Sequence, residues 1–271
     1  MSNIKEPIKV GAVQMDCIRG DKRQNLKKAI TLLDEACNKG ANLVVLPELF
    51  STGYSVKDYD MDLAENIPGE TTENLKNIAK ERGVYIAGAI LEHGESQGVI
   101  YDTAFFISPD RIEGTYRKIF LWDSERTRFR HGYSFPIFKS NFGIVGMQIC
   151  YEVGFPEGAR ILTLKGADIL LYHAAFSAQK YYVWDIATRS RALENGVFLI
   201  ASNRSGKEDT LEFAGHSRII NPKGEILCEA THLDEVIVFP IDLDLVPKQR
   251  REIPYLRDYE KAILLDSLNN I

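Results

Sequence analysis

The sequence predicts a single α/β domain built from layers of strands and helices. Apolar runs typical of buried strands alternate along the chain with amphipathic segments at helical spacing. No linker, low-complexity tract or change of composition divides the 271 residues. One helix–glycine–strand pattern occurs twice, at 39–46 and 165–172, which suggests two similar half-sheets, although such a likeness also arises by chance.

The expected elements follow one another in the order typical of α/β layers. Asp21 is expected to cap the first helix, and Gly40 to end it in the left-handed conformation that glycine tolerates. Thr71 or Thr72 is expected to cap the second helix, which ends at Gly83. The expected strands cover 8–15, 42–46, 84–91, 99–107, 111–119, 136–139, 142–150, 168–172, 197–202 and 236–241, with a hairpin within 214–230, and the expected helices cover 22–39, 71–82, 156–165 and 177–195.

Composition and charge argue against several classes of function. With 45% hydrophobic and 26% charged residues, the chain has the composition of a soluble protein with a sizeable core. A net charge of −5 without a Lys/Arg-rich stripe argues against a nucleic-acid partner. No apolar stretch approaches the roughly 20 residues that span a bilayer, and the first residues contain no apolar signal region. We therefore expect no membrane association.

Cysteine and histidine usage favours reduced thiols and no metal. The four cysteines, at positions 17, 37, 150 and 228, show no Cys-x-x-Cys spacing, which favours free thiols in the cytoplasm. The five histidines show no metal-ligand spacing, and no phosphate-binding glycine loop is present. We expect neither a metal nor another cofactor.

Three ionisable residues lie at the ends of expected buried strands: Glu48, Lys118 and Cys150. Loops at strand ends are where sites on rigid scaffolds collect. Taken singly, each has a plainer interpretation: Glu48 as a cap or surface carboxylate, Lys118 as a solvated strand end, Cys150 as a small buried hydrophobe. Together, they are a complete set for acyl transfer through a thioester.

The chemistry of this set depends on the turn at Cys150. The strand over 142–150 ends abruptly there, and a helix opens at Pro156, so the thiol is expected at the rim of a sheet. The positive charge of Lys118 is expected to lower the pKa of the thiol, and Glu48 to accept its proton. Lys118 and the backbone N–H of Tyr151 would stabilise the oxyanion.

Three segments resemble, in order and spacing, the signature blocks of the nitrilase superfamily, the carbon–nitrogen hydrolases. The likeness covers nearly the whole chain, and its blocks are 46–54 (LPELFSTGY), 116–122 (YRKIFLW) and 148–157 (QICYEVGFPE). The resemblance implies a four-layer αββα sandwich of two mixed β-sheets. It also implies that Glu48 is the general base, Lys118 the oxyanion stabiliser and Cys150 the nucleophile. Glu125, in a further block over 125–132, would orient Lys118 or the leaving group.

The residues after Cys150 do not decide between an amide, an N-carbamoyl and a nitrile substrate. The pair Tyr151-Glu152 is intermediate between the Tyr-Asp of many amide hydrolases in this family and the Trp-Glu of true nitrilases. The segment at 155–157 (FPE) is usual in amidase and carbamoyl-hydrolase branches, so a small amide or N-carbamoyl substrate is favoured over a nitrile. A catalytically silent binding subunit is the third alternative.

Several residues are expected to contact substrate. Tyr151, Tyr54, Phe176 and Glu152 are the main candidates, and His173 is either a substrate contact or a structural histidine. Further aromatic side chains in or near strand-end loops are candidates for pocket walls: Trp122, Phe129, Phe155, Tyr181 and Tyr182.

The resemblance also implies association of the chain with itself. Members of the family usually pair through the helix after the nucleophile and through helices corresponding to 177–195, with C-terminal tails that reach over the partner. The tail over about 247–271 is polar at first and amphipathic from Tyr255, with apolar positions at 259, 263 and 264. We expect a homodimer or a larger homo-oligomer.

Overall fold

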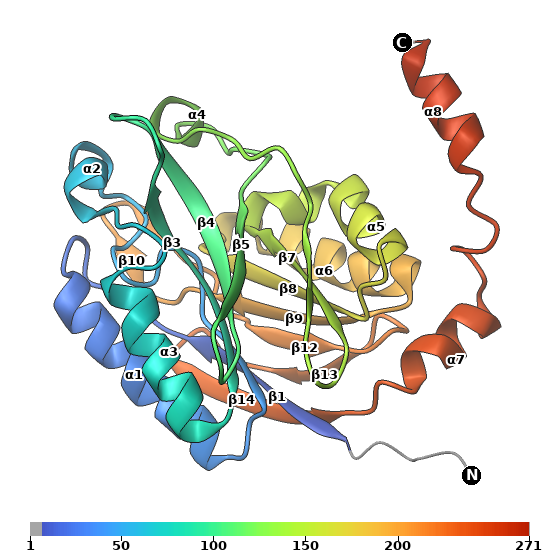
Figure 1. Ribbon diagram of the computed structural model, residues 1–271, viewed down its shortest axis with the longest axis horizontal. Helices are drawn as coiled ribbons and strands as arrows, with labels where there is room; N and C mark the ends of the chain where they lie inside the picture. Colours follow the sequence, from blue (N-terminus) through green and yellow to red (C-terminus); the bar gives the residue numbers. More distant parts are fainter. Residues whose placement is uncertain (1–6, 271) are drawn as a thin grey trace.

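The computed structural model describes residues 7–270, which form two six-stranded β-sheets packed face to face (Figure 1). In the first sheet the strand order is β14-β1-β2-β3-β4-β5. Its strands are β14 (Glu235–Ile241), β1 (Ile8–Gln14), β2 (Leu43–Val45), β3 (Tyr85–His93), β4 (Ile100–Ile107) and β5 (Ile112–Arg117). Strands β1, β2 and β3 are parallel and the other pairs are antiparallel, so the sheet is mixed.

The second sheet repeats this arrangement. Its order, read in the corresponding direction, is β6-β7-β8-β9-β12-β13, with β7, β8 and β9 parallel and the other pairs antiparallel. Its strands are β6 (Ile137–Lys139), β7 (Ile144–Ile149), β8 (Ile169–Ala174), β9 (Phe198–Asn203), β12 (Arg218–Ile220) and β13 (Ile226–Glu229). The repeated sequence pattern leads into β2 and β8, which occupy equivalent positions, so the expectation of two similar half-sheets is confirmed.

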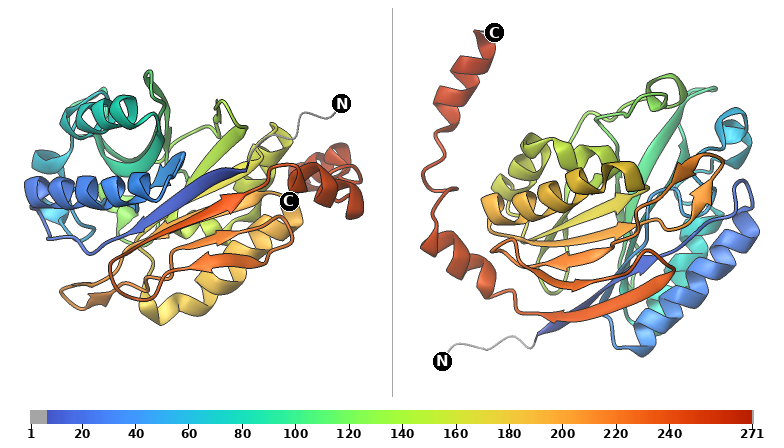
Figure 2. Two further views of the ribbon diagram at one scale, coloured as in Figure 1. Left: turned by 90° about the horizontal axis from the view of Figure 1, so that it is seen from below. Right: turned by 180° about the vertical axis from the view of Figure 1, so that it is seen from behind.

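Helices cover the outer face of each sheet (Figure 2). The first sheet is covered by α1 (Lys22–Asn38) and α3 (Glu70–Arg82), the second by α5 (Pro156–Leu164) and α6 (Tyr181–Asn195). Apolar side chains of both sheets, such as Val45 and Met147, form one core between them. The structure therefore has the predicted four-layer αββα architecture.

The ends of the helices follow local sequence, with one difference from expectation. Asp21 caps α1 by accepting a hydrogen bond from the Gln24 amide at 3.0 Å. Helix α3 begins one residue earlier than predicted: Gly69 is its N-cap, and Thr72 lies inside the first turn, where its Oγ1 accepts from the Gly69 amide at 2.9 Å. This bond from the N-cap amide to the side chain of the third helical residue is one half of a capping box.

Short elements were not predicted. These are η1 (Lys57–Tyr59), α2 (Asp60–Leu63), α4 (Glu125–Arg128), η2 (Cys150–Gly154), η3 (Ala178–Lys180), the hairpin of β10 (Lys207–Glu208) and β11 (Leu211–Glu212), and α7 (Leu245–Glu252). The amphipathic end of the tail forms α8 (Lys261–Asn269), which extends away from the sandwich (Figures 1 and 2). The side chain at position 264, one of the expected apolar positions, lies outside the described residues. No helix in the described part of the chain is long and apolar enough to cross a membrane.

Candidate active site

Strand ends from both sheets meet at one edge of the sandwich. Leu46 and Pro47 separate Glu48 from the end of β2, and Lys118 directly follows β5 of the same sheet. Cys150 directly follows β7 of the second sheet. All three side chains are buried, Glu48 and Lys118 completely. The fold therefore brings together the three residues that were predicted to act together.

Cys150 occupies a strained backbone position. Its φ of 49° lies in the left-handed region, which residues with a side chain rarely adopt. Non-glycine residues are held there only when the surrounding structure enforces it, and such positions cluster at active sites. The cysteine begins η2, whose first amides, including that of Tyr151, have no carbonyl partner within the helix. This is the geometry of a nucleophile on a strand-to-helix turn with N–H groups available beside it.

The ammonium of Lys118 lies among three carboxylates. Its Nζ is 2.6 Å from Oε1 of Glu48, 2.9 Å from Oε1 of Glu125 and 3.4 Å from Oδ2 of Asp102. The second oxygen of Glu48 accepts a 2.8 Å hydrogen bond from the Ala175 amide. Oxygen atoms of the three acids lie within 4.8 Å of one another, the only such acidic or metal-ligating group among the described residues, and the cation that they surround is the lysine itself.

Burial and neighbouring charges set the protonation states. Burial raises the pKa of the Cys150 thiol well above its usual range, and the adjacent Glu48 carboxylate adds to this. Burial also acts to raise the pKa of Glu48, but the charge of Lys118 and hydrogen bonds outweigh it, and the pKa is lowered. Burial opposes the charge on Lys118, yet the surrounding carboxylates, Glu125 first, raise its pKa.

The net pKa of Cys150 is therefore raised, although Lys118 was expected to lower it. The lysine does act in that direction, but its charge is directed at the carboxylates, and desolvation of the thiol dominates. The resting site holds a neutral thiol beside an ionised carboxylate and an ammonium. A thiol in that state needs a base to accept its proton, and Glu48 is ionised and adjacent.

Glu125 is held in place by its own loop and by an aromatic hydroxyl. One oxygen accepts a 2.6 Å hydrogen bond from the Tyr54 hydroxyl in addition to Lys118. The other accepts from the Trp122 amide at 2.8 Å. Sequence reasoning placed Tyr54 in the pocket wall but did not anticipate its bond to Glu125.

Asp102 was missed by sequence reasoning. It lies in β4, completely buried, and its Oδ1 has no hydrogen-bond partner among the described residues. Burial raises its pKa well above the usual range, and Glu48 and Glu125 add to the rise although Lys118 opposes it. An aspartate inside the largely apolar strand Ile100–Ile107 was the signal that could have found it.

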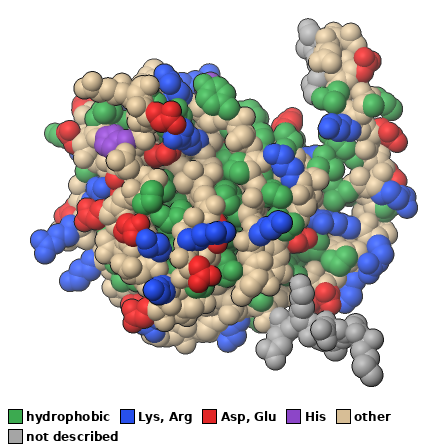
Figure 3. Space-filling model, in the orientation of Figure 1, with side chains coloured by type: hydrophobic (Ala, Val, Ile, Leu, Met, Phe, Trp, Pro, Cys, Tyr) green, Lys and Arg blue, Asp and Glu red, His purple; other side chains and the backbone are tan. Residues whose placement is uncertain are grey.

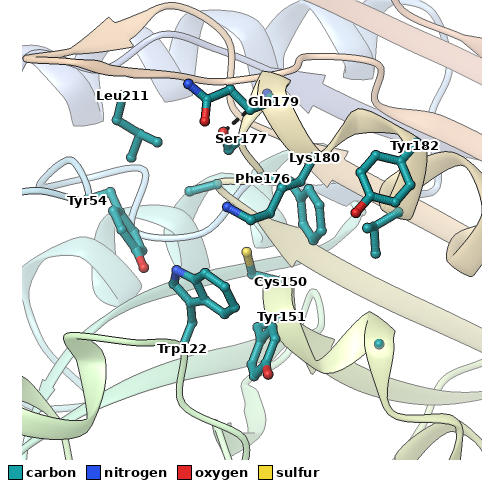
Figure 4. A pocket seen from close by; sticks show the side chains of 13 residues that line it. Tyr54, Trp122, Cys150, Tyr151, Phe176, Ser177, Gln179, Lys180, Tyr182 and Leu211 are labelled. Carbon is teal, nitrogen blue, oxygen red and sulfur yellow. Dashed lines mark hydrogen bonds between the residues drawn. The ribbon is translucent and has the colours of Figure 1, made fainter.

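A cavity of about 360 Å³ opens over Cys150 (Figure 4). Of the predicted contacts, Tyr54, Tyr151 and Phe176 line it, together with Trp122 and Tyr182. Sequence reasoning missed Gln179, Lys180 and Leu211, which lie on η3 and the β10–β11 hairpin and also line the cavity. Three aromatic candidates do not line it: Phe129, Phe155 and Tyr181.

Glu152 lies behind the cavity and does not line it, contrary to expectation. One oxygen accepts hydrogen bonds from the Tyr116 hydroxyl at 2.6 Å and the Ile119 amide at 2.9 Å. The other accepts from the Ile149 amide at 2.7 Å. Both oxygens are thus used to join the loop after β5 to the turn at Cys150, because a completely buried carboxylate must be satisfied by donors. We correct its role to a structural one.

His173 is likewise buried and does not line the cavity. Its Nδ1 lies 2.8 Å from the Leu46 carbonyl oxygen, so that β8 of the second sheet is linked to the segment that carries Glu48. Burial lowers the pKa of His173 to about 4, and the ring is neutral. Of the two interpretations offered by the sequence, the structural one agrees with this position.

The comparison with known proteins places this fold and site in one family. A family model described as carbon–nitrogen hydrolase matches residues 9–251. The chain is 40% identical to a nitrilase of Pyrococcus abyssi, over 90% of this chain and 93% of that protein. It is 37% identical to omega-amidase NIT2 of Xenopus tropicalis, over 87% and 89% of the two chains. The chain belongs to the carbon–nitrogen hydrolase family, as the resemblance implied.

Solved structures agree with this placement. Nit3 of Saccharomyces cerevisiae, a member of branch 10 of the nitrilase superfamily, superimposes with a TM-score of 0.87 at 28% identity, covering 96% of this chain and 99% of that one. A mutant of the amidase from Nesterenkonia sp. AN1 superimposes with a TM-score of 0.81 at 25% identity, covering 92% and 96%. That structure shows covalent addition of the acetamide moiety of fluoroacetamide at the active-site cysteine.

Proposed function

We propose that this carbon–nitrogen hydrolase cleaves small carboxamides or N-carbamoyl compounds through a thioester on Cys150. The observation that carries the proposal is the buried set of Cys150, Glu48 and Lys118, with an ionised base beside a neutral thiol. The relatives named as omega-amidases support an amide substrate. The covalent adduct on the cysteine of the Nesterenkonia amidase supports the nucleophile.

The proposed reaction converts an amide and water into a carboxylate and ammonium. Glu48 accepts the thiol proton while Cys150 sulfur bonds to the amide carbon, and Lys118 with the Tyr151 amide stabilises the oxyanion. Glu48 then protonates the leaving nitrogen as the carbon–nitrogen bond breaks and ammonia departs. Water attacks the thioester, its proton passes to Glu48, and the carboxylic acid leaves as the thiol is restored.

Ammonia release and an acyl adduct on Cys150 test this mechanism. Short amides, ω-amides and N-carbamoyl amines are incubated with the protein, and the adduct is sought by mass spectrometry. Cys150→Ala is expected to abolish both signals, and Cys228→Ala, a half-buried free thiol in β13, serves as the matched control. Full activity in Cys150→Ala would refute the mechanism.

Nitrile hydrolysis is the second candidate, because a relative at 40% identity is named a nitrilase. The sequence also offers Glu152, which matches the glutamate in the Trp-Glu pair of true nitrilases, although its side chain lies outside the cavity. A panel of nitriles assayed beside the amides decides between them: acid from amides and none from nitriles removes this candidate.

We also propose that the chain acts as a single-domain homo-oligomer in the cytoplasm. Exposed apolar side chains on α5 and α6 support association: Ile161, Leu164, Ile186 and Leu193. Hydrophobic side chains also lie along the C-terminal segment beside the body (Figure 3), among them Tyr255 and Ile263. Sedimentation that shows only monomer at micromolar concentration would exclude the oligomer.

A further inference from the structure

The Ala175 amide links the base and the nucleophile, which come from different sheets. It donates a 2.8 Å hydrogen bond to Oε2 of Glu48, whose other oxygen pairs with Lys118. Burial raises the pKa of the Cys150 thiol, and a backbone hydrogen bond from Ala175 acts against this rise. Glu48 belongs to the first sheet, whereas Ala175 follows β8 of the second sheet, the neighbour of the strand that leads to Cys150. This amide therefore helps to set where the base lies relative to the nucleophile.

The direction of the Ala175 amide depends on the peptide groups on either side, because Ala175 lies beyond the end of β8, in no helix or strand. On one side, the Ala174 carbonyl oxygen, in the same peptide group as the Ala175 N–H, accepts from the Arg204 amide at 3.0 Å. On the other side, the Phe176 amide donates to Oδ1 of Asn203 at 2.7 Å. Both peptide groups around Ala175 are thus held from the end of β9.

Both polar atoms of the Asn203 side chain are hydrogen-bonded in this position. The side chain is completely buried, and Oδ1 accepts from the Arg204 amide at 2.9 Å as well as from Phe176. Its Nδ2 donates to the Gly215 carbonyl oxygen at 2.7 Å. A buried amide group that loses a partner is left with the full cost of desolvation, so these bonds hold the side chain in one orientation.

We propose that Asn203 is a positioning residue for the catalytic base, and that it acts through the peptide group that binds Glu48. The inference rests on the proposed role of Glu48 and adds the side chain that keeps this base in place beside Cys150. Without the Asn203 side chain, the Phe176 amide has no acceptor and the N–H of Ala175 is no longer directed at the Glu48 carboxylate. Asn203 does not line the cavity, so it acts without touching the substrate.

Loss of this contact should lower kcat more than it changes KM. Glu48 accepts the thiol proton as the carbon–sulfur bond forms, so a displaced carboxylate raises the barrier of that step and leaves substrate binding unchanged. A side chain that only stabilised the fold would lower the free energy of unfolding and leave kcat as it is. One that only held the Phe176 wall of the cavity would raise KM. The three roles therefore give different results.

Steady-state kinetics on any amide that the enzyme hydrolyses tests the proposal. We expect Asn203→Ala to lower kcat about tenfold with a change in KM below about threefold. Asn203→Asp keeps an acceptor oxygen in the same place, and in its protonated form also a donor for Gly215, so its kcat should stay within about threefold of the wild type. Unchanged kcat in Asn203→Ala would overturn the proposal, as would a loss in Asn203→Asp equal to that in Asn203→Ala.

Asn221→Ala is the matched control. Asn221 is a second buried asparagine whose Oδ1 accepts from two backbone amides, those of Lys223 at 2.9 Å and Glu225 at 3.1 Å. It lies in the turn between β12 and β13 and does not line the cavity. Its kcat should match that of the wild type even if the protein unfolds at a lower urea concentration.

Alkylation of Cys150 by iodoacetamide separates this proposal from the proposed function, because the thiol proton must leave but no amide is hydrolysed. Mass spectrometry of the Cys150 peptide gives the rate, which should fall about tenfold in Asn203→Ala. In a Glu48→Gln background the same substitution should change the rate less than about twofold, because the base that Asn203 positions is absent.

Slower alkylation that depends on Glu48 supports the positioning role even if no amide is a substrate. Equal alkylation rates in the wild type and Asn203→Ala contradict it even if the wild type is an amidase. An equal loss with and without Glu48 also contradicts it, because Asn203 would then act on the thiol by another route.

Discussion

Asp102 determines how much negative charge surrounds Lys118. If all three acids were ionised, one ammonium would face three carboxylates in a buried space, and like charges this close do not all ionise. Asp102 is the acid whose pKa burial raises most clearly, while that of Glu48 is lowered. The raised pKa favours the protonated form of Asp102, so that two carboxylates rather than three face the ammonium of Lys118.

We predict that Asp102→Asn retains kcat/KM within about threefold of the wild type near pH 7, because an amide replaces a protonated carboxyl of the same shape. As the pH rises, the variant should lose activity later than the wild type, since its side chain at position 102 cannot add a third negative charge beside Lys118, Glu48 and Glu125. The pH profiles of kcat/KM measure this. A loss at pH 7 as large as that of Glu48→Gln, about 10²-fold or more, would show that Asp102 acts as an anion.

Sequence reasoning could predict the site residues that are ionisable and stand at the end of an apolar strand. Glu48, Lys118 and Cys150 each stand at the end of an apolar run, where an ionisable side chain is conspicuous in the sequence. Asp102 lies inside such a run, and no local pattern tells a buried catalytic acid from a satisfied structural one. Lys180 was missed because an exposed lysine at the start of a helix is common and its relation to Trp122 is made only by folding.

At the scale of elements, the β10–β11 hairpin supports the active-site loop. Glu208 of β10 accepts hydrogen bonds from the backbone amides of Tyr54, at 3.1 Å, and Ser55, at 2.7 Å, and pairs with the buried Arg204 guanidinium. The Tyr54 hydroxyl in turn binds Glu125, which contacts Lys118. A continuous set of polar contacts thus runs from the hairpin to the oxyanion site.

We predict that Glu208→Gln lowers kcat about tenfold with a smaller change in KM, because Tyr54 and Glu125 lose their fixed positions. Steady-state kinetics on any amide that the enzyme hydrolyses measures the changes in kcat and KM separately. Glu212→Gln in the same hairpin is the control, since Glu212 is exposed and pairs only with Lys207 among the described residues; its kcat should not change. A Glu208→Gln enzyme that melts earlier but keeps kcat would mean that Glu208 only stabilises the fold.

Long elements were predictable and short ones were not. Strands such as β3 and helices such as α1 carry enough alternating or helical positions to reveal their period. The strands of the hairpin have two residues each, and α4 has four, so each contains only about one repeat of its pattern, too little to reveal a period. The hairpin carries Leu211, which lines the cavity and was missed, whereas Glu125 of α4 was found only through the resemblance to a family block.

At the scale of the whole molecule, His173 makes the folded state sensitive to acid. Its pKa is about 4 in the folded protein and 6.5 in its ordinary state, so the unfolded chain binds more protons between these values. The stability that depends on its neutral form is complete above pH 6.5. It is lost as the pH falls from 6.5 towards 4, by about 3 kcal/mol at most.

We predict that His173→Asn, which keeps a donor for the Leu46 carbonyl oxygen, has a shallower pH dependence of unfolding free energy between pH 6.5 and 4 than the wild type. Urea denaturation at several pH values measures the slope. His131→Asn is the control, because that histidine is exposed. Parallel slopes for wild type and His173→Asn would show that other groups cause the acid sensitivity.

The division of the site between two sheets has a mechanical consequence. Glu48, Lys118 and Glu125 belong to the half of the chain that forms the first sheet, and Cys150 to the half that forms the second. The gap between base and nucleophile is therefore set by the thickness of the apolar layer between the sheets, where side chains such as Met147 act as spacers. Misplacement of a catalytic group by about 1 Å can reduce a rate about 10²-fold. The turnover rate is therefore sensitive to small changes in the thickness of that layer. A slight expansion of the core will lower the turnover rate before any unfolding is detected.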